Sequence, residues 1–246
     1  MVGIILAGGN GNRLKNSFDD NCCKPLVKIE EKALIEFSLE ALIDLQIRNV
    51  CIVVGDESNL IQAAIGSDYK GLNISYIQQN KTNGLFAALS LALEKIKDED
   101  ILLQLADEIF IGLNIEKIKG HIGSSEYDFY CGFTYEDEAE RIKANYSIDV
   151  DGQFNVLKCT EKPKTVCNNL KGTGFCIFSR KSLNLLKPTD AGESIQDLCD
   201  FINLLIQKNH KGLAICIAEK EFNINTYEDL KEALDFFNVR SAENRF

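Results

Sequence analysis

Three closely spaced glycines stand near the start of the sequence, and two cations follow them. Gly8, Gly9 and Gly11 come directly after an apolar run, and Arg13 and Lys24 lie further along. Glycines after a buried strand let backbone N–H groups approach a ligand closely, because no Cβ stands in the way. Successive N–H groups in such a turn bind anions, and arginine and lysine both suit phosphate. The pattern favours a loop for phosphate or nucleotide, and a plain strand-to-helix turn with two surface cations is the alternative.

Neither of two familiar phosphate loops fits this stretch. The Rossmann pattern needs a third glycine where Leu14 stands, and the Walker loop needs Gly-Lys-Ser or Gly-Lys-Thr, which the stretch does not contain. The sequence therefore predicts that phosphate or nucleotide is bound by another kind of loop.

Two acidic residues form a second group that could do chemistry. Asp107 and Glu108 follow the apolar run 101–105, and two acids after a buried strand can hold a divalent cation together with phosphate. An exposed acidic turn is the alternative. Upstream, residues 78–84 lead into a predicted helix over 85–96, whose N-terminus is a further candidate site for an anion or a carbonyl group.

The composition argues against several other classes of protein and kinds of site. The formal net charge of −10 argues against a general nucleic-acid binder, and no apolar run approaches the length of a membrane span. The 9 cysteines include no Cys-x-x-Cys pair, and the 2 histidines have no partner at ligand spacing. A zinc site or a Cys–His nucleophile is therefore not expected. Reduced thiols predict a cytoplasmic location.

Strands that alternate with helices must position these groups. Apolar runs indicate buried strands at 4–6, 50–55, 74–77 and 101–105, with helices over 33–45, 58–65 and 85–96 between them. This alternation predicts a parallel α/β sheet, in which ligands bind at the C-terminal ends of the strands. The glycine loop would lie at that edge.

The second half of the sequence predicts a further set of strands and helices. Strands are expected at 126–135, 146–150, 154–160, 172–178 and 213–218, and helices at 195–206 and 227–237. Asp151-Gly152 is typical of a hairpin turn between two of these strands. Because no linker, repeat or low-complexity segment divides the sequence, one mixed α/β domain is expected.

Short motifs along nearly the whole chain resemble, in the same order, those of the sugar-phosphate nucleotidyltransferases, specifically the glucose-1-phosphate thymidylyltransferase-like branch. Residues 6–14 are similar to the signature L-A-G-G-x-G-T-R-L, and residues 105–110 to the strand end L-G-D-N-I-F. The other matching segments are Lys24-Pro25-Leu26, Gln79 with Gly84-Leu85, Glu161-Lys162-Pro163, Thr173-Gly174 and Asn223-Ile224-Asn225-Thr226.

The resemblance implies a Rossmann-like mixed sheet of the GT-A-like type, flanked by helices and carrying a small β-rich sugar-binding insertion. It implies one domain over residues 1–246, with a nucleotide-binding half over about 1–112 and a sugar-phosphate-binding half over about 113–246. The implied reaction transfers a nucleotidyl group from UTP or dTTP to a sugar 1-phosphate and releases pyrophosphate. Positioning and charge neutralisation catalyse such in-line transfer, so no side-chain nucleophile is needed.

The same resemblance implies a role for each matching residue. For the nucleotide these are Leu6, Ala7, Gly8, Gly9, Gly11 and Gly84, together with Gln79, whose amide can read the imide edge of uracil or thymine. For the sugar phosphate they are Tyr146, Glu161, Lys162, Thr173 and Gly174. Among the catalytic cations, Arg13 would neutralise the pyrophosphate, Lys24 the α-phosphate region, and Lys162 the sugar phosphate. Asp107 would bind Mg²⁺, with Asn225 or Asn223 as the second protein ligand.

Several positions depart from the family pattern. Asn12 replaces a threonine, Ala106 replaces a glycine, and Asn223 stands where the family often has aspartate. An amide oxygen can still bind a divalent cation, so Asn225 is the expected ligand and Asn223 the second choice. Ser147 replaces a glycine beside the sugar, and its hydroxymethyl group could alter which sugar fits.

Two other functions stay open at this point. One is a cytidylyltransferase for a sugar phosphate or for an alcohol phosphate such as phosphocholine. The other is a non-catalytic relative that binds a nucleotide or a nucleotide sugar, which the neutral Asn223 would favour. A measurement of pyrophosphate release from triphosphates and sugar phosphates would distinguish an enzyme from a non-catalytic binding protein. The sequence does not fix the sugar or the base, and a homo-oligomer is left open.

Overall fold

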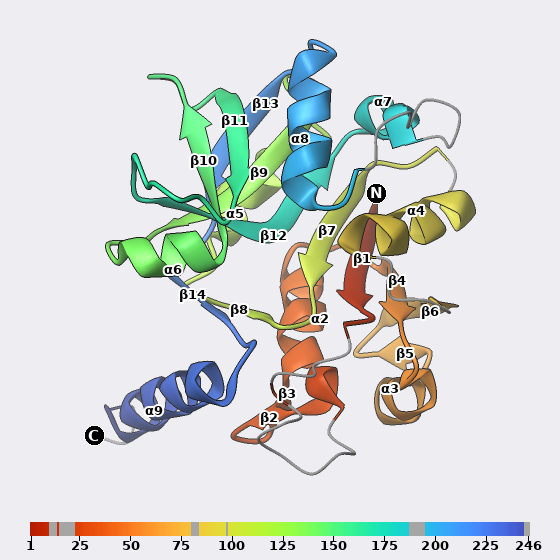
Figure 1. The fold of residues 1–246 in the computed structure, drawn as a ribbon. Helices are drawn as coiled ribbons and strands as arrows, with labels where there is room; N and C mark the ends of the chain where they lie inside the picture. The colour runs from red at the N-terminus through yellow and green to blue at the C-terminus, as the bar shows by residue number, and fades with distance from the viewer. Residues whose placement is uncertain (10–13, 15–22, 80–83, 97, 187–194, 244–246) are drawn as a thin grey trace.

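Parallel strands flanked by helices make up the first half of the fold (Figure 1). The computed structural model describes residues 1–9, 14, 23–79, 84–96, 98–186 and 195–243. The parallel strands are β1 (Val2–Ala7), β4 (Asn49–Val54), β6 (Leu72–Gln78) and β7 (Ile101–Leu105), in the spatial order β7-β1-β4-β6. The predicted parallel α/β arrangement is confirmed.

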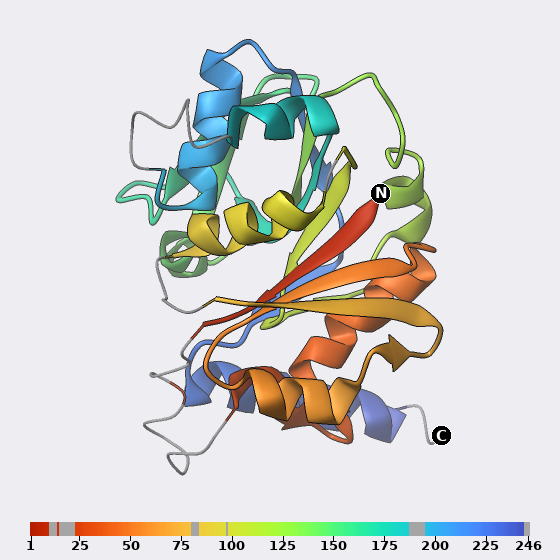
Figure 2. The same ribbon diagram turned by 90° about the vertical axis from the view of Figure 1, so that its right-hand side faces the viewer.

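Helices cover both faces of these strands, as Figure 2 shows: α2 (Leu34–Asp44) and α3 (Ser58–Ile65) lie on one side, and α4 (Leu85–Lys95) lies on the other. Successive side chains of β1 point to opposite faces. Ile4 accordingly belongs to the core cluster that contains Leu89 of α4, and Ile5 belongs to the cluster that contains Leu39 of α2. Burial on both faces explains why these strands are continuous apolar runs.

A long antiparallel strand joins the second half to the first. β12 (Leu170–Phe178) pairs with β7, with Cys176 opposite Leu103, and it also pairs with β9 (Phe129–Tyr135) and β10 (Tyr146–Val150). The hairpin partner β11 (Val156–Glu161) pairs with β10, and β13 (Gly212–Cys216) runs parallel to β9. One 10-stranded sheet therefore contains strands from both halves of the chain.

A two-stranded sheet that the sequence did not predict lies beyond the end of β7. It pairs β8 (Glu108–Ile111) with β14 (Lys220–Asn223), and α9 (Tyr227–Glu243) follows it. The alternative of an exposed acidic turn at 107–108 is wrong for Glu108, which begins a strand and is 3% exposed, whereas Asp107 lies in a turn and is partly exposed. Strands of 4 residues whose partner is far away in sequence leave little local signal.

Other boundaries differ from the predicted ones by a few residues. The strands expected from 126 and 154 begin at Phe129 and Val156, and the helix expected from 195 is α8 (Leu198–Gln207), whose N-cap Asp197 accepts from the backbone N–H of Asp200 at 2.9 Å. The remaining elements are η1 (Lys24–Leu26), β2 (Lys28–Ile29), β3 (Lys32–Ala33), β5 (Asp68–Tyr69), α5 (Ile115–Lys119), α6 (Ala139–Ala144), α7 (Arg180–Leu183) and η2 (Asn184–Leu186). In the described ranges, every helix is too short or too polar to span a membrane.

Candidate active site

Two adjoining cavities lie where the C-terminal ends of the parallel strands meet the second half of the fold. The smaller cavity, of about 260 Å³, is lined by Leu6, Gly8, Gly9, Gln79, Gly84, Leu85, Ala88, Leu105 and Asp107. The larger, of about 470 Å³, is lined in part by Leu85, Leu105, Tyr146, Glu161, Lys162, Gly174, Asn223 and Asn225. Leu85 and Leu105 contribute to both. The residues predicted for the nucleotide and for the sugar phosphate thus separate largely into two neighbouring spaces.

Close packing explains the residue types in the smaller cavity. A Cβ on Gly8 would lie 3.0 Å from Oε1 of Gln79, so any larger residue here would require the amide of the predicted base reader to shift. Gly84 has a φ of +88°, a conformation that favours glycine, and it is the N-cap of α4. Ala7 ends β1 and is buried, but it does not line the cavity.

Gln79, the predicted base reader, is buried directly after β6. Its backbone N–H donates to the carbonyl oxygen of Val54 at 2.8 Å, which fixes the residue at the end of β6. Its side chain is 5% exposed, and Nε2 has no hydrogen-bond partner among the described residues. A buried donor without a partner carries an energetic cost that a ligand carbonyl group could remove. The predicted Gly11 and Arg13 lie outside the described residues.

Lys24 contacts one lining residue of each cavity. Its ammonium Nζ lies 2.5 Å from Oδ2 of Asp107, which lines the smaller cavity, and 3.2 Å from Oδ1 of Asn225, which lines the larger one. Lys24 is 8% exposed and stands in the single turn η1, next to Pro25. Residues 24, 107 and 225, which the sequence analysis assigned to catalysis and metal binding, therefore meet at one point.

Asn225 is better placed than Asn223 to accompany Asp107. The Nδ2 of Asn225 donates to Oδ1 of Asn223 at 2.6 Å, so its own Oδ1 is turned towards Lys24. Asn223 in turn donates to Oδ1 of Asn145 at 2.9 Å. The backbone N–H of Asn225 donates to Oδ2 of Asp229 at 2.9 Å, which anchors the segment at the start of α9. This chain of amides points one oxygen at the meeting point of the cavities.

The meeting point fits a divalent cation. Oxygens of Asp107 and Asn225 already converge on one positive charge, the Lys24 ammonium. Within the described ranges, no group of three or more His, Cys, Asp or Glu side chains could hold a metal ion. Mg²⁺ commonly takes one or two carboxylates and fills its other positions with water and substrate phosphates. Two protein oxygens beside the cavity that the predicted phosphate loop lines agree with this coordination.

The larger cavity has one exposed cation at its rim. Lys162 follows β11 with a φ of +43°, and its side chain is 71% exposed. Its Nζ lies 3.7 Å from Oε1 of Glu161. Burial, with repulsion from Asp197, raises the pKa of Glu161. This arrangement suits a sugar phosphate, because the exposed lysine could contact the phosphate and the neighbouring carboxylate could accept hydrogen bonds from the sugar hydroxyls.

Thr173 is buried inside the sheet. Its hydroxyl donates to the carbonyl oxygen of Gly132 at 3.0 Å, and its own carbonyl oxygen accepts from the Tyr146 hydroxyl at 2.7 Å. Thr173 is 1% exposed and does not line either cavity. The hydroxyl is therefore used inside the sheet, and the assignment of Thr173 to the sugar phosphate stays a prediction. Tyr146 lines the cavity, and Gly172 leaves room for its ring.

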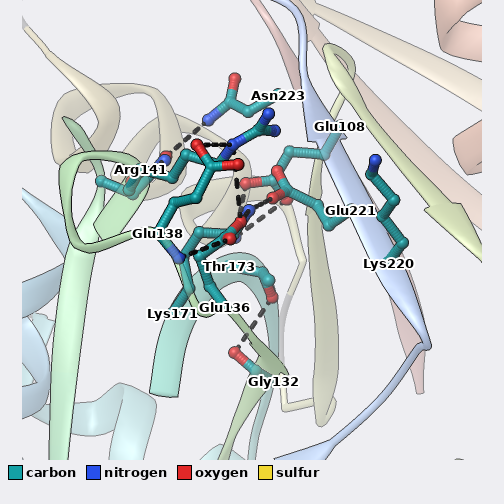
Figure 3. Close-up of polar contacts among 12 residues, drawn as sticks. Glu108, Gly132, Glu136, Glu138, Arg141, Lys171, Thr173, Lys220, Glu221 and Asn223 are labelled. Atoms are coloured by element: carbon teal, nitrogen blue, oxygen red, sulfur yellow. Dashed lines mark hydrogen bonds and ion pairs between the residues drawn. The ribbon is translucent and has the colours of Figure 1, made fainter. Parts of the chain in front are cut away.

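A buried ionic network that no motif revealed lies along the larger cavity (Figure 3). Lys171, whose side chain is 4% exposed, has its Nζ 2.8 Å from Oε2 of Glu221 and 3.3 Å from Oε2 of Glu136. Burial opposes the charged form of Lys171, but these two carboxylates outweigh it and raise its pKa. Burial, with repulsion from Glu221 and Asp107, raises the pKa of Glu108 well above its usual range. A lysine directly before Gly-Thr-Gly in an apolar strand was the available sequence signal.

Comparison with known proteins agrees with the fold and the site. The nucleotidyl transferase family model matches residues 2–237 of the chain. The chain therefore belongs to this family. The predictions of a nucleotidyltransferase fold and of an enzyme of the sugar-phosphate nucleotidyltransferase class are confirmed.

Individual relatives carry the same chemistry in their names. The chain is 30% identical over 241 residues to a UTP–glucose-1-phosphate uridylyltransferase of Haloferax volcanii, with 95% of each protein covered. It is 34% identical over 248 residues to a glucose-1-phosphate thymidylyltransferase of Streptomyces antibioticus, covering 96% of this chain and 68% of that protein. A UDP-glucose pyrophosphorylase solved with UDP-glucose has the same fold, with a TM-score of 0.82, 17% identity, and 97% and 98% of the two chains covered.

Proposed function

We propose that this enzyme transfers a uridylyl or thymidylyl group from UTP or dTTP to a sugar 1-phosphate, giving a nucleotide sugar and pyrophosphate. The observation that carries the proposal is the convergence of Lys24, Asp107 and Asn225 where the two cavities adjoin. A triphosphate in the smaller cavity and a sugar phosphate in the larger one would bring their reacting phosphates together there. Relatives named for UTP and for dTTP support both nucleotides as candidates.

Each cavity supplies the groups that its substrate needs. In the smaller cavity the backbone of Gly8 and Gly9 approaches the phosphates, and the Gln79 amide reads the imide edge of the base. In the larger cavity Lys162 holds the sugar phosphate, and Glu161 accepts from sugar hydroxyls. Binding both substrates in line turns an encounter in solution into a step within one complex.

Charge neutralisation supplies the rest of the rate enhancement. Lys24 stabilises negative charge that develops around the α-phosphate, and Arg13 is assigned to the departing pyrophosphate. Asp107 and Asn225 would hold a divalent cation, for which we propose Mg²⁺, and this ion would draw charge from the phosphate under attack. The attacking oxygen belongs to the sugar phosphate, which is already ionised at neutral pH, so no side chain has to remove a proton.

Two further assignments complete the proposal. Each cysteine that the structure describes is free, and this supports the cytoplasmic location expected from reduced thiols. The division into a nucleotide-binding half, about 1–112, and a sugar-phosphate-binding half, about 113–246, agrees with the lining of the two cavities except at Leu85 and Leu105, which line both, and at Glu108, which lines the larger one.

A substrate matrix tests the proposal. UTP, dTTP, CTP, ATP and GTP are each combined with glucose 1-phosphate, N-acetylglucosamine 1-phosphate, galactose 1-phosphate and phosphocholine, and pyrophosphate release is measured with Mg²⁺. We expect the largest kcat/KM with UTP or dTTP and a sugar 1-phosphate. A maximum with CTP and phosphocholine would establish the cytidylyltransferase alternative. No release in any combination, together with tight binding of a nucleotide, would identify a non-catalytic relative.

A further inference from the structure

Glu108 follows Asp107 in the sequence, but its carboxylate serves the opposite cavity. Its Oε1 and Oε2 accept from the backbone N–H of Gly174 at 2.8 and 2.9 Å. Asp107 instead contacts Lys24, at the meeting point of the cavities. The two acids that the sequence placed together at one cation are therefore divided between two tasks.

Gly174 belongs to a bulge in β12. Gly172 pairs with Phe133 of β9, but the next paired residue, Cys176, pairs with Cys131, so three residues of β12 stand opposite one of β9. A bulge takes backbone groups out of the ladder, and buried backbone groups need other partners. Gly172 and Gly174 both line the larger cavity, so the bulge forms part of its wall.

Three side chains satisfy the backbone groups of this bulge. Glu108 accepts from the backbone N–H of Gly174. The Thr173 hydroxyl accepts from the backbone N–H of Phe175 at 3.3 Å, and the Tyr146 hydroxyl donates to the carbonyl oxygen of Thr173 at 2.7 Å. Glu108 alone among the three comes from outside the 10-stranded sheet, at the start of β8. It ties the strand that follows the metal-binding aspartate to the wall of the larger cavity.

The wall has little room for adjustment. A Cβ on Gly174 would lie 2.3 Å from Cγ of Leu105 and 3.0 Å from Oε2 of Glu108. Leu105 also lines both cavities. The backbone at Gly174 is therefore enclosed between a side chain that separates the two substrates and the carboxylate that holds its N–H.

We propose that Glu108 is a positioning residue for the sugar phosphate: it fixes the Gly174 backbone and so sets the shape of the wall against which the sugar binds. The inference rests on the proposed function, because it takes the larger cavity as the sugar side. This role depends on the length of the side chain at residue 108, because its acceptor oxygen must extend to the N–H of Gly174. A metal-binding role would depend on its charge instead.

Three substitutions distinguish the effect of side-chain length at Glu108 from the effect of its charge. Glu108→Gln keeps an acceptor oxygen at the same reach and removes the charge, whereas Glu108→Asp keeps the charge and shortens the side chain. Glu108→Ala removes both. Because Glu108→Asp and Glu108→Ala remove a buried hydrogen-bond partner, we expect each to raise KM for the sugar 1-phosphate about tenfold. In Glu108→Gln this KM should stay within about twofold of wild type. KM for the triphosphate is expected to stay within about twofold in all three.

The controls address folding and general damage. Glu99→Asp shortens an exposed carboxylate just before the N-terminal end of β7, whereas both cavities lie at the C-terminal end of that strand, and it is expected to leave both KM values unchanged. Thr173→Val removes a different contact of the same bulge and is expected to raise KM for the sugar phosphate alone. It keeps the idea testable if Glu108→Ala does not fold. A merely structural role would reduce kcat and thermal stability without moving the KM of one substrate selectively.

Several outcomes would overturn the inference. Activity retained by Glu108→Asp and lost by Glu108→Gln would show that charge matters, as for a metal ligand. Equal increases in both KM values would also contradict it. If the wild-type enzyme releases no pyrophosphate, the proposed function fails by itself. The inference is then tested by calorimetric titration with UDP-glucose, where Asp and Ala should weaken binding about tenfold and Gln should not.

Discussion

The Lys24 ammonium lies 2.5 Å from the Asp107 carboxylate, although 83 residues separate the two in sequence. The same nitrogen is 3.2 Å from Oδ1 of Asn225, so one protein cation lies between the two oxygens proposed to hold the metal ion. Lysine carries its charge on a flexible stem and can move away when a divalent cation takes those oxygens. We therefore expect the Lys24 ammonium to compete with the proposed metal ion for these two oxygens.

The first prediction concerns Asp107. Asp107→Asn keeps the shape of the side chain but removes the charge that favours a divalent cation, so we expect kcat for Mg²⁺-dependent pyrophosphate release to fall roughly 100-fold or more. Asp98→Asn is the control, because Asp98 is an exposed residue with a φ of +63°, which asparagine tolerates. Turnover near wild type in Asp107→Asn would remove Asp107 from the metal site.

Removing Lys24 should affect metal binding and turnover in opposite directions. In Lys24→Met the oxygens of Asp107 and Asn225 lose their competing cation, so we expect Mn²⁺ to bind the nucleotide-free protein about tenfold more tightly, as measured by electron paramagnetic resonance titration. Pyrophosphate release should fall, because the phosphate loses a stabilising charge. Lys28→Met, at an exposed lysine close by, should change neither quantity. Weaker Mn²⁺ binding in Lys24→Met would contradict the competition.

Two adjacent glutamines provide a test of base reading. Gln79 is buried in the smaller cavity, whereas Gln78 is exposed on the same strand. Gln79→Ala should raise KM for UTP or dTTP about tenfold, since the base loses an amide partner and a buried polar group is left unpaired. Gln78→Ala should keep KM within about twofold, as expected for a surface substitution. Steady-state kinetics at saturating sugar phosphate measure both, and equal effects would assign base reading elsewhere.

The sequence could predict those parts of the fold and the site that depend on residues close together in the chain. The parallel strands and their helices could be predicted because burial on both faces makes β1 and β4 continuous apolar runs. Gly8, Gln79 and Asp107 come just after three of those strands and line the smaller cavity, so chain position could predict the glycine loop and the acid, while the base-reading role of Gln79 came from the family resemblance.

The rest depended on pairings between distant segments. Nothing near Glu108 shows that it begins a strand paired with β14, or that its carboxylate reaches Gly174, 66 residues away. The same holds for the ion pair of Lys171 with Glu221. The motif around Thr173 could not show that its hydroxyl bonds to Gly132 and Phe175 inside the sheet, because a motif gives position in the chain and not the direction of a side chain.

Two lysines two residues apart test the sugar-phosphate site. Lys162 lines the larger cavity, and Lys164 is exposed nearby. A charge-assisted contact with phosphate predicts that Lys162→Ala raises KM for the sugar 1-phosphate about tenfold or more and leaves KM for the triphosphate within about twofold. Lys164→Ala should leave both values close to wild type. An increase confined to the triphosphate would move Lys162 to the nucleotide side of the reaction.

The glycine beside Tyr146 should be essential for packing. A Cβ on Gly172 would lie 2.0 Å from Cε2 and 2.2 Å from Cζ of the Tyr146 ring. The ring is 6% exposed and its hydroxyl is held by the carbonyl oxygen of Thr173, so it has little freedom to move away. Gly172→Ala should therefore lower the free energy of unfolding by about 1–3 kcal/mol, measured by urea denaturation.

Gly152→Ala is the matched control for this substitution. A Cβ on Gly152 would meet no atom within 4 Å, so a change within about 0.5 kcal/mol is expected. Because Gly172 and Tyr146 form the wall of the sugar-side cavity, Gly172→Ala should also raise KM for the sugar 1-phosphate in whatever protein remains folded. If Gly172→Ala kept both the stability and the KM of the wild type, the Tyr146 ring would be able to move aside, and the prediction of a rigid cavity wall would be wrong.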